Sequence, residues 1–216
     1  MKFNCLIDTS SYLNLASCEF STGTLLNFLT EKVKIQFSPE VNYEINKHQN
    51  DTIPQTNTKY KERIPTSIDR SAQVYIVRKH TYPEYERRLW GAEKPRESGN
   101  KGEKHNLSAT VDHFLKNSTK GLVYLIDDRS ALRSFLDGVI DAFPVFQIWN
   151  SLDVVLYLYM DHSRFTLEMA QSAIKDMDAK MATDNDRMDH EKTQARIRTR
   201  TNYLKYLDRI STVKKR

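Results

Sequence analysis

The chain has 216 residues, a length that suggests one domain with room for an appendage rather than two full domains. Its hydrophobic content of 39% provides enough apolar material for a core, and no apolar stretch approaches the roughly 18 residues that a membrane span needs. The net charge of +5 at pH 7 favours a polyanionic partner such as nucleic acid.

The two cysteines indicate reduced thiols rather than a disulfide framework. Cys5 and Cys18 have no CxxC spacing, so neither a disulfide framework nor a zinc site is indicated. The N-terminus runs directly into a strand-like segment and has no secretory hydrophobic region with a cleavage site. We therefore expect a cytoplasmic protein with Cys5 in its core and no membrane partner.

Short apolar runs alternate with helical patterns through the first quarter of the chain. In chain order the patterns predict a strand at 3–7, a helix at 12–16, a helix at 24–33, a strand at 34–37 and a helix that begins at Pro39. The first strand ends on an acid, Asp8, and leads into N-cap residues, which is the start of a βα unit.

From about residue 48 to residue 98 the composition changes, and we interpret this segment as an insertion. Asn, Thr, Pro, Lys and Arg dominate there with little periodicity, and the pattern at 71–78 fits either a strand or a helix. Basic and aromatic residues interleave, which suits contacts with a nucleic-acid backbone and its bases. An ordinary solvated surface with a few anchoring aromatic residues explains the same composition equally well.

The most informative stretch is the apolar run from Leu122 to Ile126, which ends in Asp127 and Asp128. A run this short and apolar predicts a fully buried central strand of a parallel sheet. A helical pattern precedes it from about 103 to 115, and a helix start at 131–135, a strand at 144–149 and an apolar helix at 152–160 follow. The alternation predicts an α/β fold, a three-layer α/β/α sandwich with a short parallel sheet.

After Ser163 the sequence predicts a basic helical C-terminal extension, so we divide the chain into a domain at 1–162 and an extension at 163–216. Apolar residues at helical spacing between 170 and 181 indicate packing, and 182–191 is polar. The tail after Glu191 is basic and includes Arg196, Arg198 and Arg200. Such a helix is typical of nucleic-acid or partner-protein binding, although a plain solvated helix would look similar.

Acidic residues recur where the predicted strands end or helices begin. Asp8 ends the first strand, Glu44 lies on the helix after the second, Glu103 opens the helix before the central strand, and Asp127 with Asp128 ends that strand. In open α/β sheets, ligands bind at the carboxyl ends of the strands. Two like charges about 4 Å apart repel by on the order of 1–4 kcal/mol in a surface-like dielectric, and a divalent cation removes that cost.

The order of these pieces resembles the PIN-domain nuclease family, and most closely its prokaryotic branch with a Gly-Glu helix start and an Asp-Asp-Arg strand end. The resemblance covers roughly residues 3–160 outside the insertion. It is carried by Leu6-Ile7-Asp8-Thr9-Ser10, by Glu44, by Gly102-Glu103 and by the segment from Leu125 to Arg133.

The resemblance implies a Mg²⁺ or Mn²⁺ site formed by Asp8, Glu44, Glu103 and Asp128, with Asp127 as a neighbouring or alternative ligand. One or two ions held there would polarise a phosphodiester and bring a bound water toward hydroxide. Three more residues are implied to contact the phosphate or orient a ligand, with helix capping or a surface salt bridge as their competing role: Thr9, Ser10 and Arg129.

The function that follows is a metal-dependent nuclease that acts on RNA more readily than on DNA. Whether it is a toxin, a defence effector or an RNA-processing enzyme stays open, as does binding to an inhibitor or partner protein or to a second copy. The alternative is an inactive PIN-like module that binds nucleic acid or protein in a larger assembly. A haloacid-dehalogenase-type phosphatase would need Asp-x-Asp where this chain has Asp8-Thr9-Ser10, and Walker-type, GxSxG and HExxH motifs are absent from the sequence.

Overall fold

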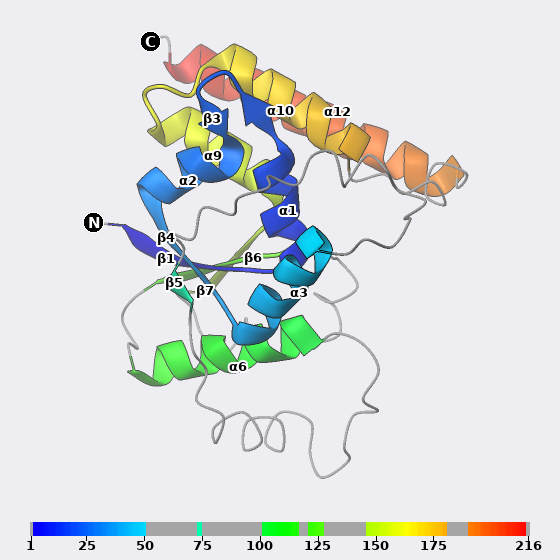
Figure 1. The fold of residues 1–216 in the computed structure, drawn as a ribbon. Helices are drawn as coiled ribbons and strands as arrows, with labels where there is room; N and C mark the ends of the chain where they lie inside the picture. Colours follow the sequence, from blue (N-terminus) through cyan, green and yellow to red (C-terminus); the bar gives the residue numbers. More distant parts are fainter. Residues whose placement is uncertain are drawn as a thin grey trace. The chain divides into compact units, whose positions relative to one another are not determined.

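The structure, a computed structural model, describes residues 2–50, 73–74, 101–116, 121–127, 146–180 and 190–214 (Figure 1). These residues form a mixed α/β fold with a parallel sheet, which confirms the predicted class at that level. The chain divides into two compact units. We call them the sheet unit and the helical unit and describe each by itself.

The sheet unit is built on parallel strands whose apolar residues are buried. The described strands are β1 (Phe3–Ile7), β4 (Val33–Phe37), β5 (Gln73–Val74), β6 (Leu122–Leu125) and β7 (Phe146–Trp149), and they lie in the order β5-β4-β1-β6-β7 with every pair parallel. All four residues of β6 are buried, as expected of a central strand covered on both faces. The predicted strands at 3–7, 34–37 and 122–126 are therefore confirmed, as is the described part of the strand predicted at 144–149, residues 146–149.

The strand order creates a switch point beside β1. From β1 the chain adds β4 and then β5 on one side, and it later returns to add β6 and β7 on the other side. The connections of β1 and β6 thus leave in opposite directions although the two strands are neighbours. In open α/β sheets, this arrangement opens a crevice at the carboxyl ends of the two strands, where ligands bind.

Two helices complete the described part of the sheet unit, α3 (Pro39–Asn50) and α6 (Lys101–Lys116). They pack against each other (Figure 1), and α6 also contacts β1. Pro39 occupies the first position of α3, where its missing N–H costs no helical hydrogen bond. The buried Val41, Ile45, Leu107 and Phe114 supply apolar side chains on the two helices.

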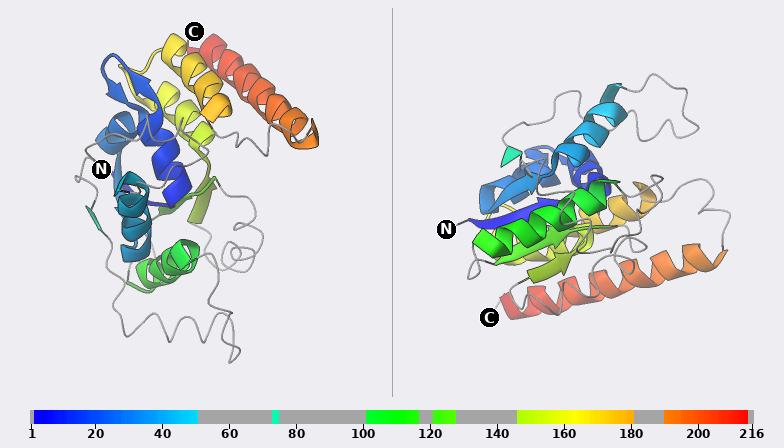
Figure 2. Two further views of the ribbon diagram at one scale, coloured as in Figure 1. Left: turned by 45° about the vertical axis from the view of Figure 1, so that its right-hand side comes forward. Right: turned by 90° about the horizontal axis from the view of Figure 1, so that it is seen from below.

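The helical unit contains a short hairpin and several helices. Its described elements are most of α1 (Thr9–Ser17), β2 (Glu19–Phe20), β3 (Gly23–Thr24), α2 (Leu25–Lys32), α9 (Ser151–Asp161), α10 (Leu167–Lys180) and α12 (His190–Lys214); the first three residues of α1 group with the sheet unit. The helices α10 and α12 lie side by side and α10 also packs on α9 (Figure 2). Fully buried side chains on each of the three helices, Leu158, Ile174 and Leu207 among them, form this core.

Side-chain contacts hold α12 along α9. The Tyr203 hydroxyl donates to Asp153 Oδ1 at 2.7 Å, and the Asn150 amide donates to that hydroxyl at 3.0 Å. Eleven residues later the Lys214 ammonium donates to the Tyr159 carbonyl oxygen at 2.6 Å. Because the contacts advance in the same direction along both helices, α12 runs parallel to α9.

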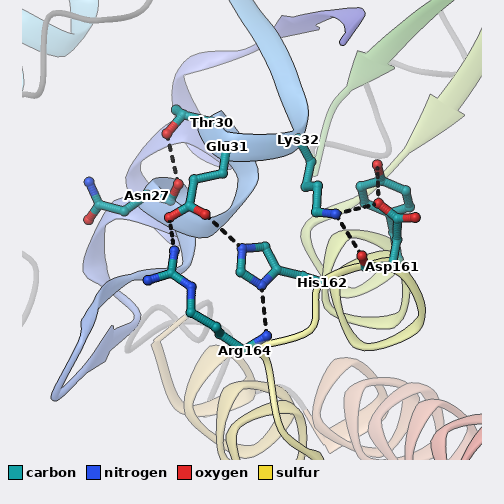
Figure 3. Close-up of polar contacts among 8 residues, drawn as sticks. Asn27, Thr30, Glu31, Lys32, Asp161, His162 and Arg164 are labelled. Carbon is teal, nitrogen blue, oxygen red and sulfur yellow. Dashed lines mark hydrogen bonds and ion pairs between the residues drawn. The ribbon is translucent and has the colours of Figure 1, made fainter. Parts of the chain in front are cut away.

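A second set of polar contacts ties the end of α2 to the end of α9 (Figure 3). The Lys32 ammonium donates to the Asp161 carbonyl oxygen at 2.7 Å and lies 3.0 Å from its carboxylate. The neighbouring Glu31 carboxylate lies 3.0 Å from Nε2 of the buried His162 and also pairs with Arg164. His162 Nδ1 accepts the Arg164 backbone N–H at 3.2 Å, so Nε2 is the nitrogen that carries the proton toward Glu31.

The predicted helices at 12–16, 103–115 and 152–160 are confirmed, and the helix predicted at 24–33 begins at Leu25. Before it the chain makes the β2–β3 hairpin, which the sequence did not predict and in which Gly23 adopts a φ of 129°. The helical spacing that starts at residue 170 falls in α10, which is described up to Lys180. The helix start predicted at 131–135 lies outside the described residues. In the described part of the chain, no helix combines the length and apolar character that crossing a membrane requires.

Candidate functional site

Asp8 stands directly after β1 and caps helix α1. Its side chain is only 3% exposed, and its Oδ1 accepts the Ser11 backbone N–H at 2.8 Å, the bond expected of an N-cap residue. Its Oδ2 accepts the Ser10 hydroxyl at 2.6 Å, while its own N–H donates to the Leu125 carbonyl oxygen of β6 at 3.0 Å. The carboxylate is therefore fixed from both sides at the junction of β1 and β6.

The electrostatic environment of Asp8 differs from that of an ordinary helix cap. The pKa of its carboxyl group is raised to about 7. Burial is the main cause, the hydrogen bonds from Ser10 and Ser11 oppose it, and the negative charge of Asp127 adds to it. Asp127 is half-buried and follows β6 by two residues. Two carboxyl groups therefore interact where β1 and β6 end, at the switch point of the sheet.

Glu44 joins this region through Thr9. The Thr9 hydroxyl donates a short hydrogen bond to the Glu44 carboxylate, so the first residue of α1 is tied to the middle of α3. A Cβ placed on Gly102 would lie 3.0 Å from Glu44 Oε2 and 3.2 Å from Oε1. A larger residue at position 102 would therefore require the Glu44 carboxylate to shift by a few tenths of an ångström, whereas glycine leaves room for it.

Asn106 was not among the predicted site residues, yet it fixes three segments at this edge. Its side chain is fully buried on α6. Its amide nitrogen donates to the Ile7 carbonyl oxygen at 3.0 Å and lies 3.4 Å from the Tyr124 hydroxyl oxygen, and its Oδ1 accepts the Ser38 N–H at 3.4 Å. The residues at the ends of β1 and β4 are thus held to α6 by one side chain.

The predicted ligand set is only partly within the described residues. Asp8, Asp127 and Glu44 are described; Asp128 and Arg129 lie outside, as does the side chain of Glu103. Among the described residues, no group of three His, Cys, Asp or Glu side chains lies close enough together to hold a metal ion. The carboxylate oxygen atoms of Asp8 and Asp127 are nonetheless the hard ligands that Mg²⁺ and Mn²⁺ prefer. The chemical type of these donor atoms therefore fits such an ion.

The basic residues predicted to bind nucleic acid lie on different sides of α12. Arg198 is exposed, whereas Arg196 and Arg200 are half-buried and share the helix face of the buried Leu207. The Ser10 hydroxyl donates a hydrogen bond to the Asp8 carboxylate and the Thr9 hydroxyl donates one to the Glu44 carboxylate.

No protein-family model matches the chain, and comparisons with curated proteins and with solved structures return no match.

Proposed function

We propose that the protein is a Mg²⁺- or Mn²⁺-dependent nuclease that hydrolyses phosphodiester bonds, in RNA more readily than in DNA. The supporting observation is the pair of interacting carboxyl groups, Asp8 and Asp127, at the carboxyl ends of the two strands that flank the switch point. The proposal includes a PIN-like, three-layer α/β/α arrangement and Glu44, Glu103 and Asp128 as further site residues.

A purely structural role does not explain Asp8. An N-cap needs an oxygen acceptor, which Asn or Ser supplies without the cost of burying a charge beside a second carboxylate. A raised pKa near 7 means that the folded chain disfavours the ionised form at neutral pH. A divalent cation would remove both the burial cost and the repulsion, so the arrangement favours metal binding.

Within this proposal, Asp8 and Asp127 are expected to hold the ion, and Ser10 and Ser11 fix the orientation of Asp8 by the hydrogen bonds described above. Thr9 hydrogen-bonds the Glu44 carboxylate, which lies close to Gly102 at the start of α6. When bound, the ion would polarise the phosphodiester and lower the pKa of a bound water.

The decisive variant is Asp8→Asn, because Asn caps a helix as well as Asp and keeps the Oδ1 acceptor for Ser11. We expect its Mg²⁺- or Mn²⁺-dependent cleavage of labelled RNA to fall by at least about 10- to 100-fold, the loss seen even for residues that only support metal ligands. Asp176→Asn, the same change in a half-buried residue of α10, is the matched control and should cleave like the wild type.

A second readout does not depend on activity. Mn²⁺ at about 100 times its Kd should stabilise the wild type by about 2.7 kcal/mol in thermal melting, and Asp8→Asn should lose most of that gain. Undiminished cleavage by Asp8→Asn would refute the assigned site. A wild type that binds RNA without cleaving it and without a metal-induced shift would instead support the inactive binding module.

We also propose the cytoplasm as the place of action. Neither cysteine forms a disulfide bond and both are buried. Burial raises the pKa of the Cys5 thiol to about 12, so this thiol stays protonated inside the core. Reduced thiols of this kind are usual in a reducing compartment.

A further inference from the structure

One face of α12 carries three exposed basic side chains, Arg198, Lys205 and Arg209, which we call the basic face. At about 100° per residue, all three lie within about 20° of the direction opposite the buried Leu207. They extend over about 16 Å of helix axis at about 1.5 Å per residue. The helix is the orange-to-red segment in Figures 1 and 2.

The positive charges of the basic face are not paired with acidic side chains in the described part of the chain. None of its three side chains takes part in an ion pair there, whereas Lys214 on the opposite side donates to Tyr159. Two exposed acids lie on α12, Glu191 at its start and Asp208 on the flank. From residue 192 to the helix end, Asp208 is the only acid, so positive charge dominates this surface.

An exposed aromatic ring lies beside the basic face. Tyr206 is 50% exposed and lies one residue from Lys205 and three from Arg209, so its ring flanks the stripe. Its ring meets the Tyr203 ring edge-on, with centroids 6.2 Å apart, and Tyr203 is itself bonded to Asp153. The Tyr206 ring is therefore supported from inside the unit while much of its surface remains open to a partner.

The exposed cations and the exposed ring of Tyr206 together favour one kind of polyanionic partner over another. A helix that lies on a lipid surface needs a free apolar face, but the apolar face of α12 is packed against α9 and α10 around Leu207. Spaced cations track a phosphate backbone, and an exposed aromatic ring stacks on unpaired bases of any sequence. The partner that this surface matches is therefore a single-stranded nucleic acid, which offers both phosphates and unpaired bases.

We infer that the basic face of α12, with Tyr206 at its edge, is a docking surface for single-stranded nucleic acid. The phosphates pair with Arg198, Lys205 and Arg209, and one base stacks on Tyr206. This surface does not require the cleavage proposed above, because it lies on α12 of the helical unit, whereas Asp8 and Asp127 belong to the sheet unit.

The test is binding of the full-length protein to a fluorescein-labelled 12-nucleotide oligouridylate, followed by anisotropy over a range of salt concentrations. EDTA is present throughout, so that metal-dependent cleavage cannot contribute and a failed active site cannot mimic failed binding. For Lys205→Gln/Arg209→Gln, the slope of log K against log salt should become shallower by about 1.4, since each phosphate contact on a single strand contributes about 0.7.

The matched control is Lys34→Gln/Lys175→Gln, which removes the same two charges from exposed lysines on β4 and α10. Its salt slope should stay at the wild-type value. Tyr206→Ala should weaken binding about 5- to 100-fold through lost stacking while leaving the salt slope unchanged. All substituted residues are exposed, so unchanged melting curves are expected for each variant.

Three outcomes overturn the inference. An unchanged slope in Lys205→Gln/Arg209→Gln shows that these cations do not contact phosphates. An equal change in the control pair shows that only overall charge matters. Failure of the wild type to bind the oligonucleotide, with binding to anionic vesicles or an acidic protein instead, assigns the face to another partner.

Discussion

Replacing Asn106 by Ala tests the packing of the candidate site more directly than replacing any of the acids. The Asn106 side chain is fully buried and bonded to Ile7 and Ser38, the residues where β1 ends and where β4 has just ended. Alanine removes both contacts at once without adding a charge or a clash. We expect a clear loss of stability, because both abandoned backbone groups belong to buried residues.

The magnitude follows from the groups left without partners. An abandoned buried donor or acceptor costs roughly 1–3 kcal/mol, which gives roughly 2–6 kcal/mol for the Ile7 carbonyl and the Ser38 N–H together. Alanine returns up to about 0.7 kcal/mol through its higher helix propensity on α6. The net expectation is a destabilisation of about 1.5–5 kcal/mol, a large share of the 5–15 kcal/mol that a domain typically has.

Urea unfolding followed by circular dichroism at 222 nm measures this loss. The midpoint should fall while the slope m stays constant, since the surface exposed on unfolding hardly changes. Asn46→Ala is the control: Asn46 is a half-buried helical residue that bonds only within α3, to Asn42, and its replacement should shift stability by about 0.5 kcal/mol or less. An Asn106→Ala protein as stable as this control would show that the buried amide does not hold the strand ends.

Two further predictions concern the helical unit. Hydrogen bonds from Arg164 and His162 lower the pKa of the Glu31 carboxyl group, so Glu31 stabilises the fold at pH values above its unfolded pKa of about 4.3 and loses this effect as the pH falls through its folded pKa. The melting temperature of Glu31→Gln should therefore lie below that of the wild type at pH 7, and the gap should narrow as the pH falls through the folded pKa of Glu31. A gap that stays constant as the pH is lowered would contradict this linkage. Tyr203→Phe removes the hydroxyl bonded to Asp153 and should cost about 1–2 kcal/mol in urea unfolding, with a value indistinguishable from zero arguing against the contact.

The parallel sheet was predictable because its strands are short apolar runs that are bounded by residues typical of turns and helix starts. β6 is buried at every position, and β4 alternates as a half-covered strand should. The presence of acids at strand ends was equally visible, because Asp8 and Asp127 directly follow apolar runs. Parallel strands bring their carboxyl ends to one edge, so local pattern was enough to place both acids there.

The remaining features depend on contacts that no local pattern encodes. The order β5-β4-β1-β6-β7 and its switch point arise from pairing between distant segments. Asn106 looks like any helical Asn until its partners on Ile7 and Ser38 are known. Each strand of the β2–β3 hairpin has only two residues, which is too few to show the alternation of apolar and polar residues that predicts a strand. The outward arginine of α12 could be told from its neighbours only once Leu207 had fixed the packed face.

The register of β1 has a consequence for synthesis of the protein. Asn4 pairs with Lys34 on one side and with Leu122 on the other, so the second partner is translated 118 residues after Asn4. At about 5–20 residues per second, β1 waits on the order of 6–24 seconds on the ribosome before β6 emerges. Asp8 and Asp127 cannot meet before that moment. The candidate site at the carboxyl ends of β1 and β6 can therefore form only after more than half of the protein has been made.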